Sequence, residues 1–382
     1  MAGGRLHATT DVAEAAAADV VLVTVGTPVR PDGTLAGDQL EAACTALAPH
    51  VRRGQLVIVK STVPPGATRT LVGPALEAGG LRAGRDFALA FTPERLAEGT
   101  ALRELRSLPL VVGGVTPRDT ATAAAFWEAA LGVEVVPQRS SEAAEVVKLA
   151  DNWWIDHNIA LANELAVFCD LFDVDVLDVI AAANGVPKGA GNVNILTPSV
   201  GVGGSCLTKD PWMVWRSAAD RGVDVRTVPA AREANDAMPA RTAATILAEL
   251  AALGKEPERS VVAVLGLAFK NDTGDLRATP VRGVVDELRR AGVEVRLHDP
   301  LVDPTEAAGL FGDAPDPDLE ATVRDADCVA VLARHRVFDG IDFGLLPTAA
   351  KCVLLDGRAH YPAEVVDRLR DQGYVYRGIG RR

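Results

Sequence analysis

The sequence predicts an α/β protein with two parallel-sheet domains joined by a central helical domain that contains a long helix. Short β-branched runs alternate with alanine-rich helical stretches before about residue 120 and again after about residue 258. Between residues 140 and 250 no strand-like run occurs, but long helical patterns do. We therefore divide the chain into domains at residues 1–125, 126–250 and 251–382.

The amino-acid composition limits the kinds of molecule that the protein is expected to bind. The chain has 382 residues, of which 48% are hydrophobic, a net charge of -12 at pH 7 and a pI near 5.1. An acidic surface makes nucleic acid and anionic membranes poor partners, although a local basic pocket for a phosphate stays possible. The N-terminus lacks the basic-then-apolar pattern of a secretory signal, and no apolar run is long enough to span a bilayer. We expect a cytoplasmic protein.

The first domain is expected to place three loops in one crevice. Its strands are predicted at VVLVTV, LVIVK, FALAF and LPLVVGG, and the loops after the first three read GTP, KSTVPPG and TPERLAEG. Ligands of an open α/β sheet bind beyond the carboxyl ends of its strands. Thr27, Thr62 and Glu94 should therefore converge there.

The central and C-terminal domains follow from the change of pattern. A helix is predicted from Ser140 or Ser141, either of which can cap it, through SEAAEVVKLADNWWIDHNIALANELAVFCDLF. A helix of this length should span domains or form a subunit interface. The later alternation predicts strands at RSVVAVLGLAF, VEVRLHD, CVAVLA and KCVLLDG, and a helix at PVRGVVDELRRAG.

The five cysteines suggest one unusual thiol. None belongs to a CxxC motif or has a histidine at ligand spacing, so neither a disulfide framework nor a metal site is expected. Four lie among apolar neighbours and are typical core thiols, namely Cys44, Cys169, Cys328 and Cys352. Cys206, in GVGGSCLTKDP, has no such neighbours. It is the candidate nucleophile.

Two alternatives stay open around Cys206. The glycines before it would allow a substrate to approach, and a following helix N-terminus together with Lys209 would favour the thiolate. Asp210 could then share that face. Alternatively, Asp210 is only an N-cap with Pro211 at the first helical position.

Other polar residues also have two interpretations. Lys148 and Asn152 are an i, i+4 pair that could hold an oxyanion, or a solvated helix face. Glu94 could act as an acid or only cap or pair. Lys270 and Arg277, after the strand VVAVLGLAF, could bind a diphosphate or be solvated loop charges.

The order of these motifs resembles that of the UDP-glucose/GDP-mannose dehydrogenase family of nucleotide-sugar 6-dehydrogenases, over nearly the whole chain. The matching motifs, in family order, are GTP, KSTVPPG, PERLAEG, the helix with Lys148 and Asn152, ANE, GVGGSCLTKD, AREAND, GLAFKNDTGDLR and DGR. The resemblance implies two Rossmann-like domains, a homodimer and the cofactor NAD.

The resemblance also implies roles for individual residues in a two-step oxidation of a sugar hydroxymethyl group. Cys206 would form a thiohemiacetal and then a thioester. Lys148 and Asn152 would steady oxyanions, and Asp210 would assist proton transfer or water placement. The implied cofactor-binding residues are Thr27, Thr62, Glu94, Gly203, Cys206 and Arg277. Besides Glu94, Lys148 and Asn152, the implied substrate-binding residues are Gly201, Gly203, Lys270 and Arg358. Glu94 would also assist thioester hydrolysis, with Thr62 beside the water.

The resemblance leaves the sugar and the cofactor site open. GVGG, the following DPW and PER favour the UDP-N-acetyl-D-mannosamine type, whereas SCLTKD also suits UDP-glucose. Family members usually open with a strand and a Gly-x-Gly-x-x-Gly loop, but this chain opens at AGGRLHATTD. A first βαβ unit would then be absent, through a misplaced start or a real truncation, and the sheet would expose an edge and an apolar face.

Two other functions compete with the enzyme. A nucleotide-sugar-binding remnant without a complete NAD site would explain the missing glycine loop, but not the complete set of Cys206, Lys148, Asn152 and Asp210. A 3-hydroxyacid dehydrogenase of related architecture fits the order of sheet and helices but gives no reason for GVGGSC.

Overall fold

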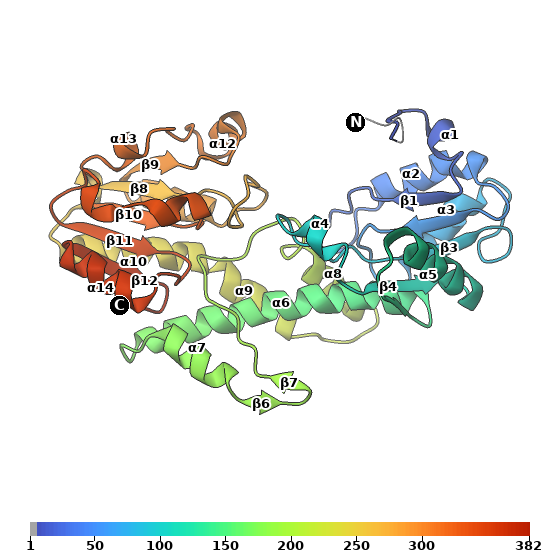
Figure 1. The fold of residues 1–382 in the computed structure, drawn as a ribbon, viewed down its shortest axis with the longest axis horizontal. Coiled ribbons are helices and arrows are strands. Elements are labelled where there is room, and N and C mark those ends of the chain that lie inside the picture. Colours follow the sequence, from blue (N-terminus) through green and yellow to red (C-terminus); the bar gives the residue numbers. More distant parts are fainter. Residues whose placement is uncertain (1–5) are drawn as a thin grey trace. The chain divides into compact units, whose positions relative to one another are not determined.

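The computed structural model describes residues 6–382, and within them the chain forms two compact units (Figure 1). The N-terminal unit comprises Met1–Trp153 and Lys209–Val225, and the C-terminal unit comprises Trp154–Thr208 and Arg226–Arg382. The α/β fold class is confirmed. The three-domain division, with boundaries after residues 125 and 250, stays a prediction.

The N-terminal unit is built on a five-stranded sheet of order β1-β2-β3-β4-β5. Its strands are β1 (Val20–Val23), β2 (Leu56–Val59), β3 (Ala88–Phe91), β4 (Leu110–Gly114) and β5 (Val135–Pro137). Within residues 6–382, β1 pairs with β2 alone, and Leu22 on it is 41% exposed. The expectation of an exposed edge strand is therefore confirmed.

One feature of this sheet differs from the prediction of parallel strands. The pairs β1–β2, β2–β3 and β4–β5 are parallel, but β3 and β4 are antiparallel, with Ala90 opposite Gly114 and Phe91 opposite Gly113. The strand motif LPLVVGG contains no signal for direction, because side-chain alternation is the same for both. β5 was not predicted.

Helices cover both faces of this sheet. One face packs Leu40, Cys44 and Leu76 against the strands, and the other packs Ala123 and Trp127. The N-terminal helices are α1 (Val12–Ala15), α2 (Asp38–Leu47), η1 (Ala48–His50), η2 (Thr68–Val72), α3 (Gly73–Glu77), α4 (Ala101–Glu104), α5 (Pro117–Leu131) and α8 (Asp210–Ala219).

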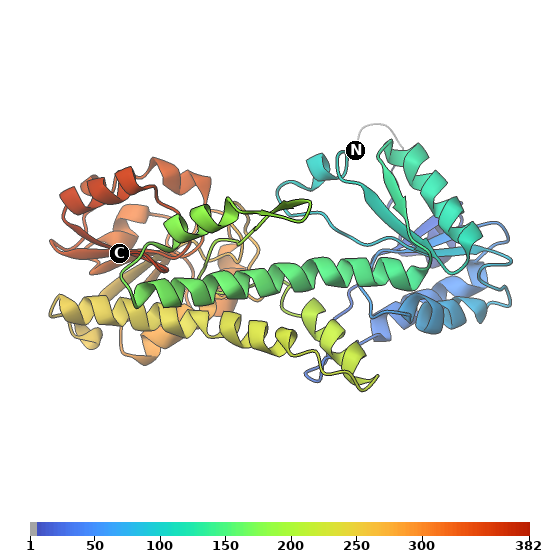
Figure 2. The same cartoon turned by 90° about the horizontal axis from the view of Figure 1, so that it is seen from below.

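The long helix is α6 (Ser141–Asp170), 30 residues without interruption (Figure 2). Its first turn is capped as predicted, since the Ser140 Oγ accepts a hydrogen bond from the Ala143 amide at 3.2 Å. The division between the two units falls within this helix.

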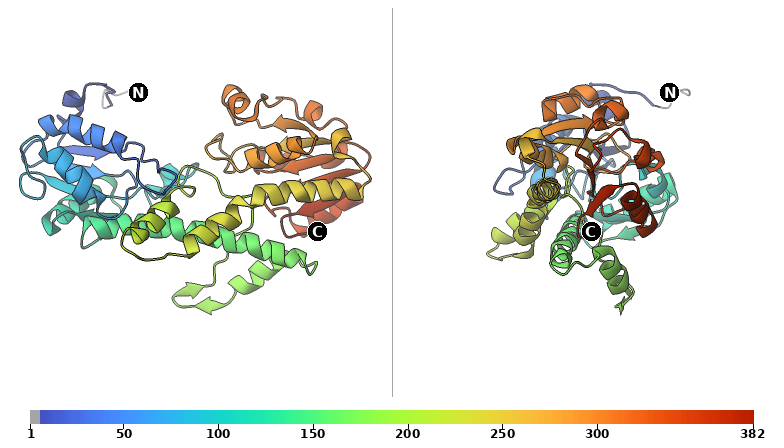
Figure 3. Two further views of the ribbon diagram at one scale, coloured as in Figure 1. Left: turned by 180° about the vertical axis from the view of Figure 1, so that it is seen from behind. Right: turned by 90° about the vertical axis from the view of Figure 1, so that its left-hand side faces the viewer.

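A small hairpin interrupts the region that was predicted to lack strands. After α7 (Val176–Asn184), the two-residue strands β6 (Pro187–Lys188) and β7 (Gly191–Asn192) pair antiparallel. Gly189 between them has a φ of 60°, which suits glycine in a tight turn. The helices α9 (Thr227–Asp236) and α10 (Met238–Ala252) follow later in the chain (Figure 3).

The C-terminal unit contains a parallel sheet of order β12-β11-β10-β8-β9. Its strands are β8 (Val261–Leu265), β9 (Glu294–His298), β10 (Cys328–Val331), β11 (Cys352–Asp356) and β12 (Tyr374–Gly378), and its helices are η3 (Pro257–Arg259), α11 (Val281–Arg290), α12 (Pro304–Phe311), α13 (Leu319–Val323), η4 (Arg336–Gly340), η5 (Phe343–Leu345) and α14 (Ala363–Asp371). Four of the five strands were predicted. β12 was missed.

Alternate residues of the central strands of this sheet enter two different apolar clusters. Ala330 and Leu355 join the cluster that includes α10, α11 and α12, whereas Val329 and Leu354 join the cluster that includes α13 and α14. The order changes direction between β8 and β10, since the chain first moves outward to β9 and then returns. The carboxyl ends of β8 and β10 therefore mark a switch point, where open α/β sheets bind ligands.

None of the helices in residues 6–382 combines the length and the apolar character that a membrane span requires.

Candidate functional site

The N-terminal unit buries an unusual set of polar groups on one face of α6. Lys148 and Asn152 are 7% and 6% exposed, so the interpretation as a solvated helix face is wrong. Asp210, which is 0% exposed, accepts a hydrogen bond from Asn152 Nδ2 at 2.5 Å. Burying polar groups away from water costs free energy. Such groups are therefore usually hydrogen-bonded to one another or take part in function.

The N-cap interpretation of Asp210 is also wrong. Lys209 occupies the N-cap position of α8, no side chain caps the helix, and Asp210 is its first residue. The Lys209 Nζ lies 2.5 Å from Asp210 Oδ1. Lys209 is thus paired with a carboxylate rather than free to stabilise a thiolate. Asp210 instead fixes the orientation of the Asn152 amide.

The loop after β2 is held against α6 by a residue that was not predicted. The Glu145 carboxylate accepts hydrogen bonds from the backbone amides of Gly66 at 2.5 Å and Thr68 at 2.9 Å, and Glu145 is 0% exposed. Burial raises the pKa of Glu145 above its usual value. The signal in the sequence was its position three residues before Lys148, one helical turn along the same face.

Thr27 and Thr62 lie at the carboxyl ends of β1 and β2, as predicted. Both are buried, at 7% and 9% exposure. The Ser61 Oγ donates to the Val25 carbonyl at 2.6 Å and so joins the two loops. The loops that contain Thr27 and Thr62 are thus joined, and their convergence with Glu94 on one crevice stays a prediction.

Glu94 pairs rather than stands alone. Its carboxylate lies 3.4 Å from the Lys60 Nζ and accepts a hydrogen bond from the Leu96 amide at 2.7 Å. Lys60 itself lies 5.4 Å from the centroid of the Trp127 ring, a cation–π contact. The Glu94 side chain remains 44% exposed, so one face of this carboxylate is accessible to solvent.

In the C-terminal unit, the glycines before Cys206 serve packing. A Cβ on Gly203 would lie 2.5 Å from the Phe269 Cβ, and one on Gly204 would lie 2.7 Å from the Phe269 ring. The Gly204 amide donates to the Arg277 carbonyl at 3.0 Å, and Thr208 Oγ1 donates back to the Gly204 carbonyl at 2.7 Å. The glycines therefore let the loop press against residues 266–280, which the sequence did not indicate.

The prediction for the five cysteines is confirmed. All are free thiols within residues 6–382; Cys44, Cys169, Cys328 and Cys352 are buried and Cys206 is exposed. Burial raises the pKa of Cys44 to about 11 and that of Cys352 to about 12. These buried thiols are inert toward solvent, and Cys206 is accessible.

A cavity of about 490 Å³ opens at the switch point of the C-terminal sheet. Its walls include Asn271 after β8, Arg334 after β10, and Arg358 and His360 after β11. The remaining wall residues are Ile159, Leu177, Leu196, Thr197, Pro198, Ser199 and Ala359. The walls therefore combine polar and apolar side chains.

Arg358 is the unusual group of this cavity. Its guanidinium donates to the carbonyls of Leu332 at 2.9 Å and Phe269 at 2.8 Å, and burial lowers its pKa to about 10. Its guanidinium donates to backbone carbonyl oxygens, so its positive charge suits an anion. The Asp356 carboxylate accepts the amides of Arg358, His360 and Tyr361 at 3.1, 2.6 and 2.9 Å, and so shapes the DGR turn.

Arg277 and Lys270, the two cations predicted to bind a diphosphate, do not belong to the walls of this cavity. Arg277 Nε donates to both carboxylate oxygens of Asp275 at 2.9 Å, so its charge is already paired, and its backbone holds the glycine loop. Lys270 is half-buried in the loop after β8 and is not among the residues that line the cavity.

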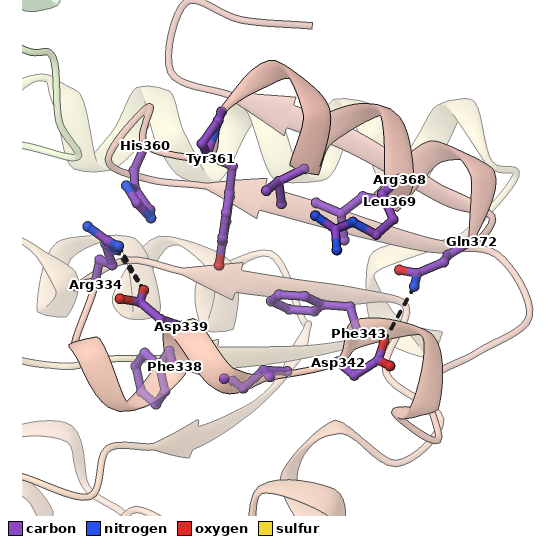
Figure 4. A pocket seen from close by; sticks show the side chains of 14 residues that line it. Arg334, Phe338, Asp339, Asp342, Phe343, His360, Tyr361, Arg368, Leu369 and Gln372 are labelled. Carbon is purple, nitrogen blue, oxygen red and sulfur yellow. Dashed lines mark hydrogen bonds and ion pairs between the residues drawn. The ribbon is translucent and has the colours of Figure 1, made fainter.

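A second cavity of about 530 Å³ lies beside the first, between η4 and α14 (Figure 4). Arg334 and His360 belong to the walls of both. Here Arg334 pairs with Asp339 at 2.8 Å, whereas Arg368 is exposed at the rim. Phe343 and Tyr361 form its apolar floor.

Each unit thus contains part of the predicted set of catalytic and binding residues. The N-terminal unit contains Thr27, Thr62, Glu94, Lys148, Asn152 and Asp210, and the C-terminal unit contains Gly201, Gly203, Cys206, Lys270, Arg277 and Arg358. Cys206 and Asp210 lie four residues apart in the chain, on either side of the boundary between units. Across residues 6–382, no three His, Cys, Asp or Glu side chains form a group suited to a metal ion.

Comparison with known proteins places these residues in a family context. Three family models match: the NAD binding domain of the UDP-glucose/GDP-mannose dehydrogenase family at residues 1–131, its central domain at residues 142–237 and its UDP binding domain at residues 263–363.

Individual relatives cover nearly the whole chain. The UDP-N-acetyl-D-mannosamine dehydrogenase of Pyrococcus horikoshii is 33% identical over 379 residues, 99% of this chain and 85% of the relative. Its solved structure has a TM-score of 0.85 at 32% identity and covers 98% of this chain and 84% of that one. The UDP-glucose dehydrogenase structure from Pyrobaculum islandicum has a TM-score of 0.84 at 30% identity, over 99% and 84%. The chain belongs to the UDP-glucose/GDP-mannose dehydrogenase family, as an NAD-dependent nucleotide-sugar dehydrogenase.

Proposed function

We propose that this chain oxidises the C6 hydroxymethyl group of a UDP-sugar to a carboxylate in two NAD-dependent steps, with Cys206 as covalent catalyst. The observation that supports the reaction most strongly is the buried trio of Lys148, Asn152 and Asp210 on α6 and α8. A fully buried carboxylate that orients an amide, with a buried lysine one helical turn earlier on the same helix face, is expensive as scaffolding, and it is useful where an oxyanion develops.

The chain's own residues fit one part of an NAD site. NAD, when bound, would accept hydride from the sugar carbon in each oxidation. Thr27 and Thr62 are buried at the carboxyl ends of adjacent strands and would line the crevice that holds NAD. Glu94, in the loop after the next strand, would line it too. Gly203, Cys206 and Arg277 would approach from the glycine loop. The residues of this chain include no Gly-x-Gly-x-x-Gly motif for the pyrophosphate.

The covalent step follows from thiol chemistry. The thiolate of Cys206 adds to the carbon of the C6 aldehyde, and the carbonyl oxygen takes up a proton, which gives a thiohemiacetal. Loss of hydride from that carbon and of the hydroxyl proton leaves a thioester. Water then adds, the carbon–sulfur bond breaks, and the carboxylate and the free thiolate result.

Neighbouring residues would assist these steps. Lys148 and Asn152 would donate hydrogen bonds to the oxyanion that forms when the thiol or water adds. Asp210 would keep the Asn152 amide oriented and place a water. Glu94, which has an exposed face, would take the proton of the attacking water, with Thr62 close to that water.

The C-terminal cavity would hold the nucleotide. Arg358, whose guanidinium rests on carbonyl oxygens, would face the diphosphate, with Lys270 as a second cation on the loop after β8. Leu196 and Pro198 offer an apolar wall for the base. Gly201 and Gly203 would approach the sugar end from the loop of Cys206.

We rank UDP-N-acetyl-D-mannosamine first and UDP-glucose second as substrate. The motifs GVGG, DPW and PER favour the first sugar, and relatives named as UDP-N-acetyl-D-mannosamine dehydrogenases reach 35% identity over 355 residues. The Pyrobaculum relative, named for UDP-glucose, supports the second.

The test measures NADH formation with each UDP-sugar in parallel, for the wild type and for Cys206→Ala. We expect two NADH per UDP-N-acetyl-D-mannosamine and loss of acid formation in the variant. Cys44→Ala serves as the matched control, because this thiol is buried among apolar residues and should leave the stoichiometry at two.

The same experiment separates the rival function. A nucleotide-sugar-binding remnant would bind UDP-sugar, measured by titration calorimetry, without forming NADH with either sugar. That result would contradict the enzyme. The burial of Lys148, Asn152 and Asp210 favours the enzyme.

We also propose a homodimer in the cytoplasm. Trp154, Leu161 and Phe168 are spaced by seven residues on α6 and are 49%, 47% and 57% exposed, followed by Leu171 at 75% and Phe172 at 64%. An apolar stripe of heptad spacing fits the same stripe of a second copy. The variant Phe168→Asp should be monomeric, and light scattering measures its mass.

The five free cysteines support the proposed cytoplasmic location, because free thiols suit a reducing compartment.

A further inference from the structure

A buried polar network links α6 and α9 to the loop that precedes Cys206. Its side chains are nearly inaccessible: Asn163 is 0% exposed, Asn235 and Asp156 are 1%, Arg232 is 3% and Ser199 is 7%. All belong to the C-terminal unit. The motifs ANE and AREAND supply Asn163, Arg232 and Asn235, and the catalytic steps above use none of them.

The hydrogen bonds converge on the Asp156 carboxylate and connect it to the loop through the two asparagines. Arg232 donates to Asp156 Oδ1 at 2.7 Å, and Asn235 Nδ2 donates to the same oxygen at 2.9 Å. Asn163 Nδ2 donates to Asn235 Oδ1 at 2.9 Å, and Asn163 Oδ1 accepts from the Ser199 amide at 2.8 Å. The network therefore ends on the backbone of the loop.

From Ser199 the contacts continue to the glycine motif. The Ser199 Oγ donates to the Gly201 carbonyl at 3.0 Å. Gly201 has a φ of 129°, and a Cβ there would lie 3.0 Å from the Pro280 Cβ and 3.3 Å from the Asn235 carbonyl oxygen. This residue is thus wedged between α9 and residue 280, and its backbone conformation is one that only glycine adopts easily.

Helix packing alone does not explain this arrangement. Apolar side chains of similar volume usually pack two helices at least as stably as a buried ion pair with amides. The irregular loop, however, lacks the regular backbone hydrogen bonds of a helix or sheet, so its peptide groups need side-chain partners. Asn163 supplies such a partner to the Ser199 amide and is itself held by Asn235, which favours one geometry for the segment.

We propose that Asn163 and Asn235 are positioning residues for Cys206, because they fix the Ser199–Gly201 backbone to α6 and α9 and thereby set where the thiol is presented. This inference rests on the proposed function of Cys206. On the other side the loop is fixed by Gly204, whose amide binds the Arg277 carbonyl, so both ends of the glycine motif are held.

The chain offers a matched control in Asn184. Its amide group makes two hydrogen bonds to the same loop, donating to the Ile195 carbonyl at 2.9 Å and accepting from the Ile195 amide at 2.7 Å. Asn184→Ala removes two hydrogen bonds to the loop, and Asn163→Ala removes one to the loop and one to Asn235. Asn184 contacts the loop at residue 195, farther along the chain from Cys206 than Ser199, and lies outside the network.

The experiment measures the products of turnover for Asn163→Ala, Asn235→Ala and Asn184→Ala, with semicarbazide present to trap free aldehyde. A displaced thiol slows aldehyde capture more than the first oxidation. We expect the first two variants to lose at least about tenfold in kcat, to release trapped aldehyde and to yield fewer than two NADH per sugar, at a KM within about twofold. Asn184→Ala should keep two NADH per sugar.

A purely structural role predicts another outcome. Fewer folded molecules would lower both oxidations alike, so two NADH per sugar and no trapped aldehyde in the Asn163 and Asn235 variants would overturn the proposal. If these variants do not fold, Ser199→Ala replaces them, because it removes only the Ser199 Oγ contact to Gly201 within the network. It should also release aldehyde, and its failure to do so would count equally against the proposal.

Two further arms separate this inference from the proposed function. Cys206→Ala that still forms acid at the wild-type rate contradicts the covalent mechanism itself. Amide hydrogen exchange, which needs no turnover, then tests positioning directly: Asn163→Ala should accelerate exchange at residues 199–204, whereas Asn184→Ala should accelerate it near residue 195. Unchanged protection at residues 199–204 would refute the positioning role.

Discussion

The two sheets of this protein differ in how completely their strands are buried. In the C-terminal sheet, β10 and β11 are buried along their whole length and all strands are parallel. In the N-terminal sheet, β1 ends the sheet with Leu22 41% exposed, and β5 at the other edge is mostly exposed. The central strands of the first sheet are fully buried, whereas within residues 6–382 the edge strand β1 of the second pairs with β2 alone.

Both units bury polar groups, but the predicted site residues lie in different settings. The N-terminal unit buries Lys148, Asn152, Asp210 and Glu145, whereas the half-buried Arg358 follows β11 at the carboxyl edge of the C-terminal sheet. We expect the C-terminal sheet to contribute more to stability than the N-terminal sheet. Four predictions test this contrast.

The largest expected effect concerns the cores. Leu354 is 0% exposed on β11, so Leu354→Ala should lower the free energy of unfolding by about 2–5 kcal/mol. Leu22→Ala, on the exposed edge, should lower it by less than about 1 kcal/mol. Urea unfolding measures both. Similar losses in the two variants would mean that β1 is covered in solution.

The second prediction concerns catalysis. Lys148→Met keeps the length of the side chain and removes its charge, and it should lower kcat by about 10²–10³-fold with little change in KM, since oxyanion stabilisation acts in the transition state. Steady-state NADH kinetics measure this. A rise in KM at constant kcat would instead assign Lys148 to substrate binding.

The third prediction concerns the C-terminal cavity. Arg358→Met should raise the Kd for UDP at least about tenfold, because it removes the half-buried cation that we propose to face the diphosphate. Titration calorimetry with UDP alone measures it. Arg368→Met, at the exposed rim of the neighbouring cavity, is the matched control and should leave the Kd unchanged.

The smallest effect concerns acid stability. Arg69 donates to Glu142 at 2.7 Å and lowers the pKa of that carboxyl from 4.5 to about 2. A depressed folded pKa contributes stability above the ordinary value and loses it as pH falls through about 2. Because the Arg69 side chain is 48% exposed, we expect less than about 1 kcal/mol. Arg69→Ala should destabilise the protein at neutral pH but not at about pH 2, measured by urea unfolding.

Aromatic residues allow the two units to be followed separately. Four of the five tryptophans, at positions 127, 153, 212 and 215, belong to the N-terminal unit, and all three tyrosines, at 361, 374 and 376, belong to the C-terminal unit. Tryptophan fluorescence therefore reports mainly on the N-terminal unit during unfolding. An earlier transition by this probe would support the contrast between the sheets.

The sequence predicted the elements that have strong periodicity or β-branched runs. The strands β1–β4 and β8–β11, the helix from Ser141 and the four core cysteines follow from local patterns of side chains. β5 and β12 were missed because VVP is short and YVYRG contains arginine and glycine. The antiparallel β3–β4 pair was missed because strand direction is a property of topology.

At the site, residue types were predictable but their contacts were not. Asp210 looked like an N-cap because Asp-Pro is a frequent helix start, yet its carboxylate turns to Asn152, which is 58 residues away in sequence. The glycines before Cys206 suggested an open approach, yet the bulk of Phe269 requires them. Contacts between distant segments decide both cases, and local patterns contain no information about them.

Because four of the five cysteines are buried, thiol reagents should modify the folded protein at one site, Cys206. Maleimides and mild oxidants react with accessible thiolates, so one equivalent should modify one residue of the folded chain. A fluorophore or spin label attached at Cys206 would then report on the glycine loop itself. Mass spectrometry of the intact protein would show a single adduct in the native state and up to five after denaturation.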